Sequence, residues 1–257
     1  MERLSIITLS NECIYEILLF LSPKNLTMCE EINNNFNCLC QLNSLWKNHF
    51  DITYNLSNKS NNYHENCKLY HQLILIIKKL NVNYLPQQLY SLQHLHLFFS
   101  QITQLPSEIG KLTDLREVWM TNNKIKEIPK EIGQLTNLQQ LYLSFNQLKN
   151  IPKEIGQLTN LVKLQLNNNM LIELPKEIGQ LTKLQYLCLH TNQLINIPEE
   201  IGQLTNLEEL WLNKNKLTNL PKELANLTTL LKLGITDNQI TKLPQEIDKL
   251  TDLKIYN

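Results

Sequence analysis

A repeat of 23 residues is the feature that most constrains this chain. From Leu92 to Leu253 a leucine opens every unit at this interval, and the unit that begins at Leu138 shows the pattern most clearly. Its apolar positions are Leu138, Leu141, Leu143, Leu148, Ile151, Ile155 and Leu158. One unit cannot bury these side chains alone, so neighbouring units must stack and share a continuous core. A fixed period of this length therefore predicts a solenoid.

The order of residues within a unit predicts the path of each coil. Leu141 and Leu143 alternate with outward-facing residues, which indicates a short strand. Asn146 follows, and an amide buried at this position must find hydrogen-bond partners. Pro152 suits the first position of a short helical turn, and we expect Gly156 to let that turn stop tightly.

The pattern L-x-x-L-x-L-x-x-N-x-L resembles the leucine-rich repeat family. The resemblance implies an α/β solenoid over residues 81–257, a horseshoe with short parallel strands on its concave face. It also implies that the repeated Asn side chains form a ladder to the backbone of adjacent units. Ser100 takes the Asn position in the first unit, so we expect a weaker ladder at that end.

Residues 1–50 lack the repeat and predict helices, because Ile14, Ile17, Leu18 and Leu21 follow one another at helical spacing. The segment from Leu9 to Leu26, with its continuation to Trp46, resembles the F-box. That resemblance implies a small all-α F-box domain that docks on the SKP adaptor of a cullin ubiquitin ligase. The adaptor-binding residues would be Leu9, Ile17, Leu18, Leu21, Pro23, Leu26 and Trp46. Ser10 and Phe36 depart from the family pattern.

Residues 51–80 are predicted to be a polar connector followed by a linking helix. Four of the cysteines are Cys29, Cys38, Cys40 and Cys67, and their spacing matches no paired C-x-x-C zinc framework. Cysteines kept as small apolar side chains suit a reducing cytosol. We therefore expect no metal site and no cofactor.

The charge balance limits the classes of partner. The chain has 24 basic and 24 acidic side chains, and neither a basic stripe nor a long apolar run. These features argue against nucleic acid and membranes as partners. No standard export signal is recognised at the start. The expected location is the cytoplasm of a eukaryotic cell, which is the host cell if the protein is a bacterial effector. The units of the form P-K-E-I-G-Q-L-T-N resemble bacterial repeat proteins, and a protist origin is the alternative.

The outward-facing residues of the strands form the predicted target-binding surface on the concave face. Trp119 and Trp211 occupy strand positions that a solenoid scaffold does not need to fill with tryptophan, and exposed aromatic side chains are typical anchors of protein interfaces. The predicted target-binding residues are His94, His96, Trp119, Tyr142, Tyr186, His190 and Trp211. We expect Gly234 to leave a depression beside Trp211, and Phe99 and Phe145 to pack in the loops.

Three hypotheses for function follow. The leading one is a substrate receptor, whose F-box binds the SKP adaptor and whose repeats bind a target protein. The second is a non-catalytic interaction scaffold whose N-terminal helices only cap the solenoid. The third is an enzyme that uses Cys188 and His190, which would face the same way along one strand. An open sheet gives such a pair neither burial nor an oxyanion hole, so we expect no enzyme activity.

Overall fold

A computed structural model describes residue 76, residues 79–80 and residues 91–256. The chain divides into two compact units, Met1–Tyr90 and Ser91–Asn257. The second unit carries the repeats. The predicted F-box, its adaptor-binding residues, the boundary at residue 50 and most of the connector lie outside the described residues. They stay predictions.

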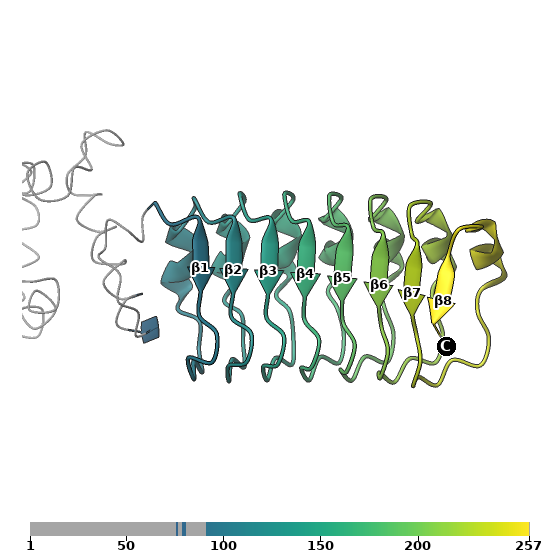
Figure 1. The fold of residues 1–257 in the computed structure, drawn as a ribbon, viewed down its shortest axis with the longest axis horizontal. Coiled ribbons are helices and arrows are strands. Elements are labelled where there is room, and N and C mark those ends of the chain that lie inside the picture. Colours follow the sequence, from purple (N-terminus) through teal and green to yellow (C-terminus); the bar gives the residue numbers. More distant parts are fainter. Residues whose placement is uncertain (1–75, 77–78, 81–90, 257) are drawn as a thin grey trace, which may run out of the picture. The chain divides into compact units, whose positions relative to one another are not determined.

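Each repeat of the second unit forms one coil with a three-residue strand and a five-residue 3-10 helix. The strands lie side by side in chain order and the 3-10 helices lie behind them (Figure 1). The strands are β1 (His94–His96), β2 (Glu117–Trp119), β3 (Gln140–Tyr142), β4 (Lys163–Gln165), β5 (Tyr186–Cys188), β6 (Glu209–Trp211), β7 (Lys232–Gly234) and β8 (Lys254–Tyr256). The 3-10 helices are η2 (Ser107–Lys111), η3 (Lys130–Gln134), η4 (Lys153–Gln157), η5 (Lys176–Gln180), η6 (Glu199–Gln203), η7 (Lys222–Asn226) and η8 (Gln245–Lys249).

The eight strands pair in parallel, which confirms the predicted solenoid with a strand-lined face. From β1 to β7 the register follows the repeat, so that His94 pairs with Glu117 and each later residue pairs with its counterpart in the next unit. The central residue of each of these strands is buried, and the apolar residue directly after the strand also enters the core. Every coil thus shares its apolar side chains with its neighbours.

The register changes by one residue at the last strand. Lys232 pairs with Lys254 and Leu233 pairs with Ile255, although the repeat predicts partners one residue later. A shift of one residue exchanges the two faces of a strand. Here it turns Ile255 toward the core and places Tyr256 on the outer face beside Trp211. The leucine period therefore holds from Leu92 to Leu253, and the shift in pairing lies after it, in β8.

The predicted asparagine ladder is confirmed. Asn169 Nδ2 donates to the carbonyl of Leu143 in the preceding coil and to that of Leu166 in its own coil, both at 3.0 Å. Its Oδ1 accepts from the backbone N–H of Leu148 at 3.0 Å. The same pattern recurs at Asn123, Asn146, Asn192, Asn215 and Asn238.

Ser100 stands in the asparagine position of the first described coil. Its hydroxyl donates to the carbonyl of Phe98 in its own loop at 3.1 Å, and the side chain is exposed. Each asparagine of the ladder instead reaches the coil before it. The Ser100 hydroxyl thus donates within its own loop, and the weaker ladder expected at this end stays a prediction, because most of the preceding segment lies outside the described residues.

Pro152 and Gly156 do not have the predicted roles in the helical turn. Pro152 is extended, with φ −66° and ψ 144°, and precedes η4 as its N-cap instead of opening the helix. Gly156 does not have a positive φ, so it is not needed to stop the turn. A Cβ atom at Gly156 would instead lie 2.6 Å from the carbonyl oxygen of Glu177 in the next coil. Glycine is required here because successive η helices approach closely.

Candidate binding surface

The outward-facing side chains of β1–β8 form one continuous surface, which we call the strand face. It corresponds to the face that the sequence predicts for target binding. Because strand residues alternate between the two sides of a sheet, the first and third residue of each strand contribute to it. The first column contains His94, Glu117, Gln140, Lys163, Tyr186, Glu209, Lys232 and Lys254, and the second contains His96, Trp119, Tyr142, Gln165, Cys188, Trp211, Gly234 and Tyr256.

Four aromatic side chains gather over β1–β3. The ring of Trp119 contacts those of His96, Phe98 and Tyr142, with centroid distances of 5.6, 5.5 and 4.0 Å. His96 and Phe98 also contact each other at 5.9 Å. We call these four residues the N-terminal aromatic cluster. His96 and Phe98 are exposed and Trp119 is half-buried, so the cluster presents apolar area to solvent.

Tyr142 is the buried member of this cluster and lies beneath Trp119. Only 7% of Tyr142 is exposed, because the indole of Trp119 covers it. Its hydroxyl donates to Gln140 Oε1 at 2.5 Å, and burial, followed by the nearby Glu117 carboxylate, raises its pKa. The sequence prediction of an exposed Tyr142 is wrong, because the sequence pattern does not show that Trp119 lies over it.

A pair of aromatic residues, Trp211 and Tyr256, lies at the other end of the sheet. Trp211 and Tyr256 have ring centroids 5.4 Å apart. A Cβ atom at Gly234 would lie 2.5 Å from Cε3 of Trp211. The expected depression beside Trp211 is therefore filled by the indole itself. Sequence analysis missed Tyr256, and the signal that could have found it is the Ile255-Tyr256 order, which fits a strand shifted by one residue.

Charged side chains border the aromatic pair of Trp211 and Tyr256. Glu209 lies before Trp211 on β6 and forms an ion pair with Lys232 on β7, with Nζ and Oε1 2.8 Å apart. The hydrogen bond from Lys232 lowers the pKa of Glu209, and the same bond raises the pKa of Lys232. This end of the strand face therefore combines an aromatic pair with a fixed pair of opposite charges.

The residues considered for catalysis lie in the middle of the sheet. Cys188 is buried, and burial raises the pKa of its thiol, so the nucleophilic thiolate is disfavoured. Burial and then Lys214 lower the pKa of His190, whose Nδ1 lies 3.0 Å from the hydroxyl of Thr191. Burial also raises the pKa of Tyr186. This arrangement lacks the activated thiol that covalent catalysis requires.

Phe99 and Phe145 do not pack in the loops as expected. Phe99 is 71% exposed and Phe145 is 49% exposed. Both have a positive φ, of 52° and 55°, at the position just before the asparagine ladder. The left-handed backbone at this position turns these side chains outward, and the sequence pattern alone does not show that conformation.

The structure brings four of the predicted target-binding residues together and separates the other three. His94, His96, Trp119 and Tyr142 lie on the adjacent strands β1–β3. Tyr186, His190 and Trp211 lie further along the sheet, on or directly after β5 and β6. Besides Tyr256, the predicted target-binding residues left out Phe98, which lies two residues after the end of β1 and contacts Trp119.

The sequence of the repeats matches a family model described as a leucine-rich repeat region, over residues 103–215 and 141–235. Together these ranges cover residues 103–235, which is more than half of the chain. The chain belongs to the leucine-rich repeat family. Proteins with this repeat typically serve as non-catalytic interaction scaffolds, and the match indicates no enzyme family. No curated protein matches the sequence of this leucine-rich repeat protein.

Solved leucine-rich repeat structures are similar to this one. A leucine-rich repeat protein of Leptospira interrogans is 44% identical, with a TM-score of 0.57, and the match covers 71% of this chain and 53% of that one. The leucine-rich repeat ectodomain of the Arabidopsis thaliana receptor kinase GASSHO1/SCHENGEN3, in complex with Casparian strip integrity factor 2, is 35% identical, with a TM-score of 0.58. That match covers 63% of this chain and 20% of the receptor.

The plant peptide hormone receptor RGFR1, in complex with RGF2, is 32% identical, with a TM-score of 0.57. The match covers 64% of this chain and 27% of that receptor. This leucine-rich repeat protein thus spans about half of the Leptospira protein and smaller parts of the plant receptors. Within the described part of the chain, no helix is long and apolar enough to cross a membrane.

Proposed function

We propose that this protein is a non-catalytic receptor that holds a target protein against its strand face. The observation that carries the proposal is the N-terminal aromatic cluster, in which Trp119 contacts three rings and leaves exposed area beside His96 and Phe98. Aromatic side chains held on a rigid surface are typical centres of binding energy in protein interfaces. Two plant structures with this repeat are complexes with Casparian strip integrity factor 2 and with RGF2, which supports a protein or peptide target.

Hydrogen bonds hold the side chains of Trp119 and Trp211 in place before a target binds. Trp119 Nε1 donates to Glu117 Oε2 at 3.1 Å, and Trp211 Nε1 donates to Glu209 Oε2 at 2.9 Å. An aromatic ring fixed in this way loses little conformational entropy when a partner covers it. The polar residues beside each ring also offer hydrogen bonds at the rim of an interface.

A pull-down from eukaryotic lysate tests the binding surface. We expect the wild type to capture a specific protein that the double variant Trp119→Ala/Trp211→Ala does not capture. Ile172→Ala/Ile195→Ala is the matched control, because it also removes two large side chains but from exposed positions outside the strands. Equal capture by the wild type and the tryptophan variant, with both proteins folded, would contradict the proposal.

We also propose that residues 1–50 dock on the SKP adaptor of a cullin ubiquitin ligase in a eukaryotic cytosol. The support is the F-box-like sequence from Leu9 to Leu26 and on to Trp46. The receptor would then do no covalent chemistry but raise the local concentration of a target near the ligase. Similarity of the repeats to a Leptospira protein is in line with an effector delivered into a host cell.

Co-purification with the SKP adaptor tests the docking. We expect the wild type to retain the adaptor and Leu21→Asp and Pro23→Ala to lose it. Retention by both variants would reject these contacts. If the wild type itself fails to bind, the scaffold alternative is favoured, and deletion of residues 1–62 should then destabilise the repeats. An enzyme would instead lose activity in His190→Ala while it keeps its target.

A further inference from the structure

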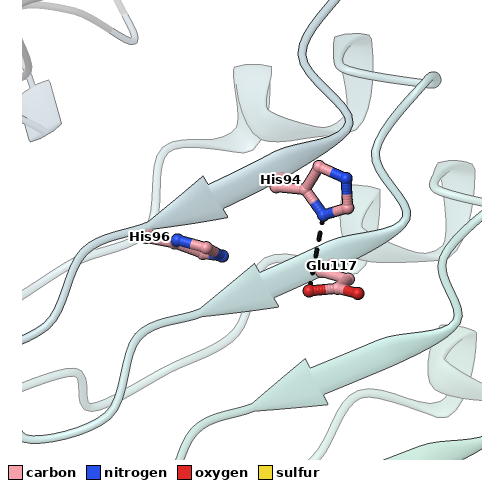
Figure 2. A group of neighbouring side chains, drawn as sticks. All are labelled: His94, His96 and Glu117. Carbon is pink, nitrogen blue, oxygen red and sulfur yellow. Dashed lines mark ion pairs between the residues drawn. The ribbon is translucent and has the colours of Figure 1, made fainter.

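We propose a binding site for a divalent transition-metal ion such as Zn²⁺ at the start of the strand face, formed by His94, His96 and Glu117. One nitrogen of each imidazole and one carboxylate oxygen lie within 4.8 Å of one another. His94 Nδ1 and Glu117 Oε2 are 3.4 Å apart, as the dashed line in Figure 2 shows. This inference does not depend on the identity of any target protein.

The backbone places the three groups on the same face. His94 and His96 are the first and third residues of β1, so both point outward from the sheet. Glu117 is the residue of β2 that pairs with His94. The site therefore stands on two adjacent hydrogen-bonded strands, which position ligands more exactly than loops do.

The spacing is compatible with coordination. Zinc bonds of about 2.0–2.2 Å in a tetrahedral arrangement place neighbouring ligand atoms about 3.3–3.6 Å apart. His94 and Glu117 already have this separation. His96 must rotate its ring toward them, and it can do so because its side chain is exposed. Figure 2 shows His96 on the same side of the sheet as the other two groups.

Hydrogen bonds behind the site hold Glu117 in place. Its Oε2 accepts from Trp119 Nε1 at 3.1 Å, and its Oε1 accepts from Gln140 Nε2 at 3.2 Å. Partners of this kind orient a metal ligand, and their removal commonly lowers metal affinity by about 10–100-fold. The carboxylate is thus shared between the site and the N-terminal aromatic cluster.

The donor set indicates which ions would bind. Two imidazole nitrogens and one carboxylate suit Zn²⁺, Ni²⁺ or Cu²⁺, whereas Mg²⁺ and Ca²⁺ require oxygen ligands. Three protein ligands leave one position of a four-coordinate ion open to the strand face. A carboxylate or imidazole of a bound target could fill it. Without metal, His94 Nδ1 and Glu117 Oε2 remain in contact at 3.4 Å.

Isothermal titration of the full chain with Zn²⁺ tests the site. Histidines and cysteines outside the described residues can also bind zinc, so the informative quantity is the difference between variants. We expect His94→Ala/His96→Ala to bind one equivalent fewer than the wild type, and His190→Ala to bind the same number as the wild type. Glu117→Gln keeps the shape of the side chain but removes its charge, and should weaken this equivalent by at least tenfold.

The outcomes separate a built site from an adventitious ion. Equal stoichiometry and affinity in the wild type and His94→Ala/His96→Ala would overturn the proposal. So would an equal loss in His190→Ala, because any surface histidine would then serve. Matching thermal unfolding curves of the metal-free proteins would show that the substitutions leave the fold intact, as expected from the exposure of both histidines.

Discussion

Trp211 is held by the residue two positions before it on the same strand: its indole Nε1 donates to Glu209 Oε2 at 2.9 Å. The same relationship joins Trp119 to Glu117 at 3.1 Å, and Tyr142 donates to Gln140 at 2.5 Å. Three aromatic side chains of the second column, Trp119, Tyr142 and Trp211, are therefore tied to polar side chains of the first. Because the same hydrogen bond recurs in several coils, it fixes the orientation of these rings before a partner binds.

Glu209 also makes stability depend on pH. The hydrogen bond from Lys232 lowers the pKa of Glu209 in the folded protein below its ordinary value of 4.5. A lowered folded pKa contributes stability above the unfolded pKa, and this contribution is lost as the pH falls through the folded value. We therefore expect Glu209→Gln to reduce the loss of stability that occurs below about pH 4.5, measured as the change in urea midpoint between pH 7 and pH 3.

Glu208→Gln is the control for this experiment. Glu208 lies beside Glu209 but is exposed, and its charge is removed in the same way. The wild type and Glu208→Gln should lose the same stability on acidification, and Glu209→Gln should lose less. If all three proteins lose the same stability between pH 7 and pH 3, the ion pair of Glu209 with Lys232 does not contribute to the pH dependence of stability.

The asparagine ladder should contribute strongly to stability. Asn169→Ala removes an amide that bonds to four backbone groups and takes one partner each from the carbonyl of Leu143 and the N–H of Leu148. Because those groups are buried, we expect a loss of about 2–3 kcal/mol in urea unfolding. Asn150→Ala, at an exposed position, should cost less than about 0.5 kcal/mol. Similar midpoints for the two variants would contradict the importance of the ladder.

Close approach between coils makes the glycine position sensitive to size. In Gly156→Ala the new Cβ would lie 2.6 Å from the carbonyl oxygen and 2.9 Å from the Cβ of Glu177. Backbone atoms cannot move aside easily, so we expect a loss of about 1–3 kcal/mol in thermal or urea unfolding. Lys153→Ala, an exposed change in the same 3-10 helix, should be close to neutral. A neutral Gly156→Ala would show that the coils can separate without cost.

The repeat predicts the fold well because the repeated residues have the same structural role in every unit. The inward leucines and the strands follow from the spacing, as the buried Leu141 shows. The asparagine ladder follows from the resemblance to the leucine-rich repeat family, and the bonds of Asn169 confirm it. The last strand does not follow, because the pairing of Leu233 with Ile255 depends on which register buries the aliphatic residue. Repetition gives the period of the chain but does not fix the register of its final unit.

The strand face is less predictable, since its properties depend on contacts between columns. The sequence places Trp119 and Tyr142 on the same face, but it does not show that one ring covers the other. The cysteine spacing predicts no metal site, whereas the site proposed here combines two histidines with a carboxylate. His94 and Glu117 are one repeat apart in the sequence, and parallel pairing makes them neighbours. A search across one repeat would have found this group.

Phenylalanine at position 145 should lower the stability of the fold, because its backbone has a positive φ. It has φ 55° and is 49% exposed, and the equivalent positions hold residues such as Asn122 and Asn168, also at positive φ. Asparagine adopts this left-handed conformation more readily than phenylalanine. We therefore expect Phe145→Asn to raise the urea midpoint, with a gain of up to about 1 kcal/mol, and Asn168→Phe to lower it. A loss of stability in Phe145→Asn would contradict this prediction and would mean that packing of the ring outweighs the backbone strain.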